Sequence, residues 1–107
     1  MRDQTAMSRA FQLFLSQAPE QAQAWLETVK KLGAASRLDH KTEALAYLGV
    51  LAAVRLEGGI AFHVKQAKAF GASREEIISA ILVGLPAVGN VVIQSLPLAL
   101  AAYDDEN

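Results

Sequence analysis

The residues from Leu56 to His63 have the spacing of a thiol active site that lacks its thiols. Cysteines at positions 56 and 59 would form a Cys-x-x-Cys pair followed, after three residues, by the histidine. Such a pair at the first turns of a helix, beside a base, has a lowered thiol pKa. Leu56 and Gly59 stand at these positions, and the sequence contains no cysteine. A thiolate nucleophile, a disulfide and a sulfur ligand for a metal are therefore excluded here.

Polar residues earlier in the chain could act together with His63 in a pocket. With an ordinary pKa near ~6.5, His63 could serve as a general acid or base. Glu43 could orient its ring, and Tyr47, one helical turn later, could place a hydroxyl in the same cavity. The alternatives stay open: a packed core histidine, a solvated Glu43 and a half-buried packing tyrosine. His40 and His63 have no partner at metal-ligand spacing, so we expect no metal and no cofactor.

Helical periodicity dominates the sequence that must position these residues. Apolar residues recur at three- and four-residue intervals, and turn residues separate the runs. The patterns predict helices over residues 7–15, 19–32, 39–55, 60–70, 74–85 and 89–103. Asp39 is a good N-cap, and Ser73 and Glu76 form a capping box. Gly33 should end the helix that precedes it, and Pro86 should end or kink its helix. We therefore predict an all-α bundle of about six helices.

Single positions predict further details of this bundle. The helix over 39–55 is apolar nearly all round, so it should lie at the centre. Gly58 and Gly59 should permit a tight corner between helices that a side chain would obstruct. Pro97 is compatible with a kink in the last helix. Residues 104–107 form an acidic tail that should fray.

Composition limits the class of protein. The 107 residues suffice for one domain, 1–107, but not for two. A net charge of -1 with scattered acids and bases leaves no basic face for nucleic acid. Hydrophobic residues make up 52% of the chain, which favours a homo-oligomer that buries part of them. The apolar stretch 77–102 is interrupted by polar residues and prolines, and no secretory signal is visible. We therefore expect a soluble cytoplasmic protein with no membrane contact.

Several motifs resemble one family signature, in order and without gaps. They are Leu38-Asp39-His40-Lys41-Thr42, Glu57-Gly58, Ile60-Ala61-Phe62-His63-Val64 and Gly71-Ala72-Ser73-Arg74-Glu75-Glu76-Ile77. These motifs resemble the carboxymuconolactone decarboxylase superfamily, most closely its alkylhydroperoxidase D-like branch. The resemblance covers about residues 38–100. It implies a core family motif over 38–103, N-terminal helices over 1–37, and assembly as a trimer or a multiple of it.

Members of the peroxidase branch cycle a disulfide with two cysteines, a glutamate and a histidine. The resemblance places the histidine at His63 and the cysteines at Leu56 and Gly59. The glutamate position falls on Ala44, one residue after Glu43. Thiol peroxidase chemistry is therefore excluded, because no neighbouring residue supplies a thiolate. The residues expected to line the remaining pocket, beside the candidate catalytic His63 and Glu43, are Tyr47, Leu56 and Gly59.

Members of the decarboxylase branch lack the cysteine pair and are thought to use a histidine for proton transfer on a lactone acid. Such a substrate needs cations to hold its carboxylates, and only Arg55 and Lys65 lie near the motif. We therefore expect a homologue without the redox centre that binds a small, partly apolar molecule near His63, or processes it without redox chemistry. Two alternatives remain: a non-catalytic oligomeric scaffold or interaction protein, and a cofactor-free lyase or isomerase in which His63 is the general base.

Overall fold

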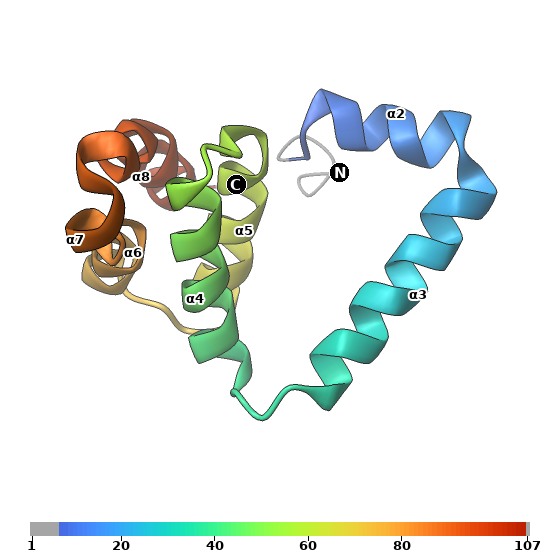
Figure 1. Ribbon diagram of the computed structural model, residues 1–107, viewed down its shortest axis with the longest axis horizontal. Coiled ribbons are helices and arrows are strands. Elements are labelled where there is room, and N and C mark those ends of the chain that lie inside the picture. The colour runs from blue at the N-terminus through green and yellow to red at the C-terminus, as the bar shows by residue number, and fades with distance from the viewer. Residues whose placement is uncertain (1–6, 107) are drawn as a thin grey trace.

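The computed structural model describes residues 7–106, and all secondary structure in this part of the chain is helical (Figure 1). The α-helices are α2 (Arg9–Gln17), α3 (Pro19–Ala35), α4 (His40–Ala53), α5 (Ile60–Ala69), α6 (Arg74–Leu82), α7 (Leu85–Val88) and α8 (Leu96–Asp104). Two 3-10 helices, η1 (Glu57–Gly59) and η2 (Gly89–Ser95), join them. The predicted all-α fold class is confirmed, and six of the described helices have nine residues or more.

Helices α4 to α8 form the core of the molecule. Helix α4 packs against α5, α6 and η2, and α8 packs against α5 and α6. Side chains with no exposed surface fill the space between these helices: Leu48, Ile60, Val64, Ile77, Ile81 and Val92. Helix α4 therefore takes the central position that its nearly uniform apolar sequence predicts.

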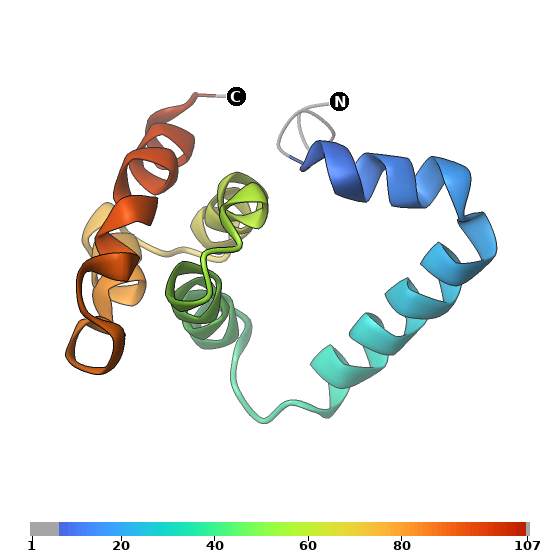
Figure 2. The same ribbon diagram turned by 45° about the horizontal axis from the view of Figure 1, so that its top comes forward.

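Helices α2 and α3 form an arm that stands apart from this core. In both views of the ribbon the arm bends away after the connection 36–39 (Figure 1; Figure 2). The two helices pack mainly against each other, and Ala22 is the only buried residue that they contain. Trp25, Val29 and Leu32 lie at i, i+4 and i+7 on α3 and remain substantially exposed. An apolar stripe of this spacing is normally covered by another element.

Two predicted helix starts are confirmed in detail, whereas the helix predicted over 89–103 is divided into η2 and α8, which begins only at Leu96. The Asp39 carboxylate accepts a hydrogen bond from the Thr42 amide at 2.7 Å, which caps α4. At the start of α6 the Ser73 hydroxyl accepts from the Glu76 amide at 3.0 Å, and the Glu76 carboxylate accepts from the Ser73 amide at 2.9 Å. Both ends satisfy amides that lack a partner inside the helix.

Two helix ends predicted from glycine and proline are wrong. Helix α3 continues through Gly33 to Ala35, because Gly33 has no positive φ and two alanines favour the helix. Helix α6 ends at Leu82, before Pro86, which instead occupies the first turn of α7. Pro97 likewise lies in the first turn of α8, where proline needs no amide hydrogen, and causes no kink inside a helix.

The corner between α4 and α5 depends on a different residue from those predicted. Arg55 adopts a φ of 62°, in the left-handed region, whereas Gly58 and Gly59 have no positive φ. A Cβ at Gly58 or Gly59 would meet its nearest side-chain neighbour at 3.4 or 3.6 Å, which is ordinary contact. The expected obstruction is therefore wrong. The tight position is Gly49, where a Cβ would lie 3.2 Å from the Ala80 carbonyl oxygen.

The acidic end of the chain is held against the core, in contrast to the predicted frayed tail. The Arg74 guanidinium donates to both Asp104 carboxylate oxygens at 3.0 Å. Lys65 pairs with Asp105 at 2.6 Å. These contacts join the end of α8 to α6 and α5. Asn107 lies outside the described residues.

The stretch Arg74–Asp104 is long and apolar enough to cross a membrane by length and composition alone. However, the chain breaks into α6, α7, η2 and α8 over this stretch, and α6 packs against α8. The stretch thus folds back on itself, as the predicted interruptions require. Only 17% of its most apolar window is buried inside the chain, so much apolar surface remains exposed there.

Candidate functional site

His63 projects from the middle of α5 into a group of aromatic rings. The Tyr47 ring of α4 lies 4.5 Å from the His63 ring, centroid to centroid, at an interplanar angle of 54°. The Phe62 ring lies edge-on at 5.2 Å. Val64 and Ile60, the neighbours of His63 on α5, are fully buried, whereas His63 itself is half-buried. The core therefore holds the helix rigidly while the imidazole edge stays accessible.

The surroundings of His63 favour its neutral form. Removal of the ring from water lowers its pKa below the ordinary value, and a hydrogen bond to Gln66 opposes this only in part. The Nδ1–H donates to the Gln66 Oε1 at 3.3 Å, because that oxygen can only accept. The lone pair of the neutral ring is then on Nε2. The adjacent Cδ2 lies 3.6 Å from the place where a Cβ at Gly59 would stand.

Two adjoining cavities between the arm and the core meet at His63. One has a volume of about 620 Å³ and extends toward the start of α4, and the other, of about 430 Å³, extends toward α2. We call them the α4 lobe and the α2 lobe. Both lobes are lined by Trp25, Val29, Tyr47, His63 and Gln66. A ligand in either lobe would contact the imidazole.

The structure brings most of the predicted site residues to these lobes. Glu43 and Tyr47 line the α4 lobe together with His63, and Gly59 lines the α2 lobe. Leu56 lines neither lobe, because its side chain points to solvent with 59% of its surface exposed. Glu43 makes no hydrogen bond to His63 in the described part of the chain. Gln66, not Glu43, therefore orients the ring.

Several lining residues were missed by reasoning from the sequence. Gln66 follows His63 by three residues, a spacing that could have identified it as a partner on the same helix face. Trp25 and Val29 belong to the apolar stripe of α3. The sequence shows the periodicity of this stripe, but it does not show that the stripe faces α5. His40 stacks on Phe70 at 5.0 Å, and both line the α4 lobe.

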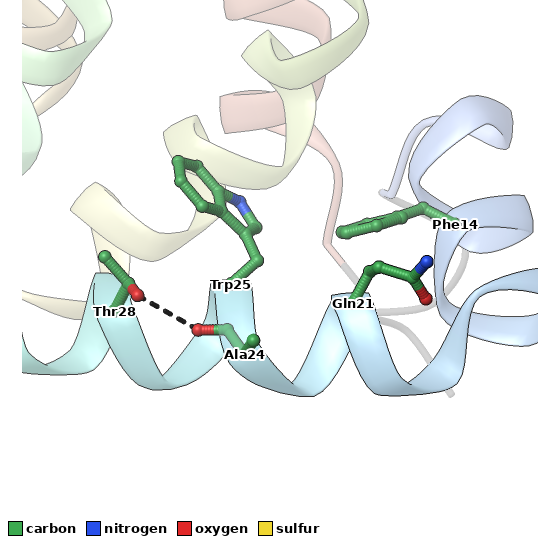
Figure 3. A pocket seen from close by; sticks show the side chains of 5 residues that line it. All are labelled: Phe14, Gln21, Ala24, Trp25 and Thr28. Carbon is green, nitrogen blue, oxygen red and sulfur yellow. Dashed lines mark hydrogen bonds between the residues drawn. The ribbon is translucent and has the colours of Figure 1, made fainter.

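Trp25 reaches from the arm toward the core. Figure 3 shows its indole extending away from α3, beside Gln21 and Phe14 of the same arm. The Thr28 hydroxyl donates to the Ala24 carbonyl at 3.0 Å and so turns back to its own helix. The hollow drawn there, about 530 Å³, is a shallow furrow along α2 and α3 without titratable residues. The titratable side chains His40, Glu43 and His63 line the α4 lobe instead, to which Trp25 also contributes.

In the part of the chain that the structure describes, no Lys or Arg side chain lines either lobe. The two cations near the motif are engaged elsewhere, since Arg55 pairs with Glu57 and Lys65 pairs with Asp105. Within residues 7–106 no group of three His, Cys, Asp or Glu side chains could hold a metal ion. The site thus offers a neutral imidazole, one carboxylate, an amide and aromatic rings.

Comparisons with known proteins identify the family. Residues 19–101 match the carboxymuconolactone decarboxylase family, which covers α3 and the core through most of α8. No curated protein and no solved structure gave a significant match. Since the matched region spans most of the 107 residues, the chain belongs to the carboxymuconolactone decarboxylase family.

Proposed function

We propose that this protein binds a small, partly apolar molecule in the two lobes beside His63 and acts without redox chemistry. One observation carries the proposal: a neutral imidazole, with its lone pair on Nε2, stands where two apolar cavities meet. A histidine that served only to fill the core would have no cavity next to the exposed edge of its ring. The absence of cysteine removes the thiol pair on which a disulfide cycle depends.

The lining argues against the decarboxylase reaction on a lactone acid. A substrate with carboxylates requires guanidinium or ammonium groups, and none of the described residues that line the lobes provides one. The Glu43 carboxylate on the wall of the α4 lobe would repel such a substrate. Family membership supplies the scaffold, and the side chains of the site decide the chemistry.

A thermal-shift screen of small aromatic and aliphatic compounds on wild type and His63→Gln tests this function. A compound present at about a hundredfold its dissociation constant stabilises by ~2.7 kcal/mol and raises the melting temperature by several degrees. We expect a shift in wild type that is lost in the variant, with equal melting points before addition. Shifts that are equal in both proteins would mean that His63 takes no part in binding.

A second candidate function is proton transfer by a cofactor-free lyase or isomerase. The specific observation is that the lowered pKa of His63 leaves it unprotonated at neutral pH, as a general base requires. If a bound compound is turned over, the rate should rise with pH through the pKa of His63 and then level off. A rate that stays constant as the pH is lowered to the point where the protein unfolds would contradict this role.

We also propose that the protein is a homo-oligomer, in which a second copy covers exposed apolar surface. A compact monomer of this mass should expose about 5,800 Å², whereas the chain exposes 7120 Å². The excess exceeds the ~800 Å² per partner that a stable interface needs. The side chains we assign to this contact, the α4-end patch, are Val50, Val54, Leu56 and Val83, all more than half exposed. The family resemblance favours a trimer or a multiple of it.

A further inference from the structure

We propose that the ligand is a small organic cation with an apolar body, such as an aryl- or alkylammonium compound. Its ammonium group lies in the α4 lobe near Glu43, and its apolar body extends into the α2 lobe. This inference rests on the proposed binding function and names the chemical class of its ligand.

The charge of the lining supports a cation. Among residues 7–106, Glu43 is the only Asp, Glu, Lys or Arg whose side chain lines either lobe. It is half-buried, and none of the ion pairs in the described part of the chain involves it. Lys41, two residues before it, pairs instead with Glu76 at 3.0 Å. A half-buried carboxylate without a counter-ion, on the wall of a cavity, attracts a cationic group.

The aromatic rings of the α4 lobe supply the second half of a cation site. Trp25, Tyr47 and Phe70 all line this lobe, and they keep 52%, 47% and 41% of their surface exposed in the free protein. The electron-rich faces of such rings attract ammonium groups, with indole the strongest. His40 covers one side of Phe70, so Trp25 and Tyr47 carry most of this attraction. An anion would meet the same rings and carboxylate unfavourably.

The α2 lobe suits the uncharged part of such a molecule. Its walls include apolar side chains that are not found in the α4 lobe, namely Met7, Phe11, Leu26 and Phe62. No Asp, Glu, Lys or Arg from residues 7–106 lines the α2 lobe. Because His63 and Tyr47 line both lobes, a molecule that spans them passes beside the imidazole. The two lobes together therefore separate a charged end from an apolar end.

Three probes of nearly equal size test the class: 2-phenylethylamine, 2-phenylethanol and phenylacetate. Trp25 is the only tryptophan in the sequence and lines both lobes, so its fluorescence reports binding directly. The His63 ring proton shifts give an independent readout. At pH 8, where His63 is neutral, we expect the amine to bind about tenfold or more tightly than the alcohol, and phenylacetate more weakly than either.

Matched variants assign the preference to one carboxylate. Glu43→Gln should reduce the preference for the amine over the alcohol to about twofold. Glu27→Gln makes the same change in net charge on α3, outside both lobes, and should leave the preference intact. Equal binding of amine and alcohol, or tighter binding of phenylacetate, would overturn the cation class while the pocket stands. If none of the probes changes Trp25 fluorescence or the His63 shifts, the pocket proposal itself fails.

Discussion

At the scale of single residues, the partial burial of His63 links the site to stability. Its pKa is lowered in the folded protein, so the unfolded chain binds the proton more readily. The contribution of His63 to stability is therefore present above the unfolded pKa of ~6.5 and is lost as the pH falls through the folded pKa. We expect wild type to lose more stability than His63→Gln between pH 7.5 and 5. Urea denaturation at both pH values measures the difference.

His40→Gln is the control for this measurement. His40 is exposed at the first residue of α4, so this variant shows how much of the change comes from removing a histidine that is not buried. The explanation by burial of His63 would be contradicted if wild type and His63→Gln lost stability in parallel.

Substitution by alanine should have opposite effects on stability at two glycines that lie in helices. At Gly49 a Cβ would come within 2.9 Å of the Val83 Cγ1 and 3.2 Å of the Ala80 carbonyl oxygen, so Gly49→Ala should destabilise by about 1–3 kcal/mol. At Gly33 a Cβ meets nothing within 4 Å, so Gly33→Ala should stabilise by about 0.5–1 kcal/mol. Chemical denaturation of both variants measures the change in unfolding free energy. If both substitutions stabilised the protein, the close approach of α4 and α6 at Gly49 would be refuted.

At the scale of elements, the capping box holds the start of α6. Ser73→Ala removes the hydroxyl that accepts from the Glu76 amide, and should cost about 1 kcal/mol of unfolding free energy. Ser79→Ala, at an exposed position inside α6, is the matched control and should be neutral or slightly stabilising because alanine favours helices. Equal losses in the two variants would show that the cap contributes nothing beyond the local helix.

The arm and the core are each well formed, but they meet through few contacts. Helix α3 presents Trp25, Val29 and Leu32 to the lobes, and the core presents Tyr47 and His63 from the opposite side. Each lobe therefore has walls from two elements that are joined only by the connection 36–39.

At the scale of the whole molecule, the open arrangement leaves more surface than a monomer of this size should have. The radius of gyration is 14.0 Å, against about 13.0 Å for a compact chain of this length. Apolar side chains account for much of the exposed surface on α3 and at the α4-end patch. The proposed oligomer explains part of this excess, because a second copy would cover the α4-end patch.

Leu56→Asp tests this assembly. A charge at the centre of an apolar contact should disperse the oligomer, because the carboxylate would be desolvated without a partner. Sedimentation velocity measures the mass, and far-ultraviolet circular dichroism checks that the helices persist. Val83→Asp places the same charge elsewhere in the α4-end patch and should act alike. An unchanged mass in both variants would rule out this patch as the interface.

The sequence by itself determined the helices and most of their starts, because capping depends on residues within one turn, as at Asp39 and Ser73. It also excluded thiol chemistry and placed Glu43 and Tyr47 one turn apart on a common helix. It could not place the helix end at Leu82 or the left-handed turn at Arg55, where the packing of neighbouring helices outweighs local preference.

Only the tertiary structure decided which side chains surround His63. Trp25 and Val29 come from an arm more than thirty residues away in the chain, and no local pattern specifies which helix its apolar stripe faces. The same is true of the charge in the lobes. Lys41 and Lys65 are close to the site in sequence, but distant carboxylates at Glu76 and Asp105 pair with them. Of the described residues, Glu43 is thereby left as the one Asp, Glu, Lys or Arg on the cavity wall, since charge balance in a cavity is a property of the whole fold.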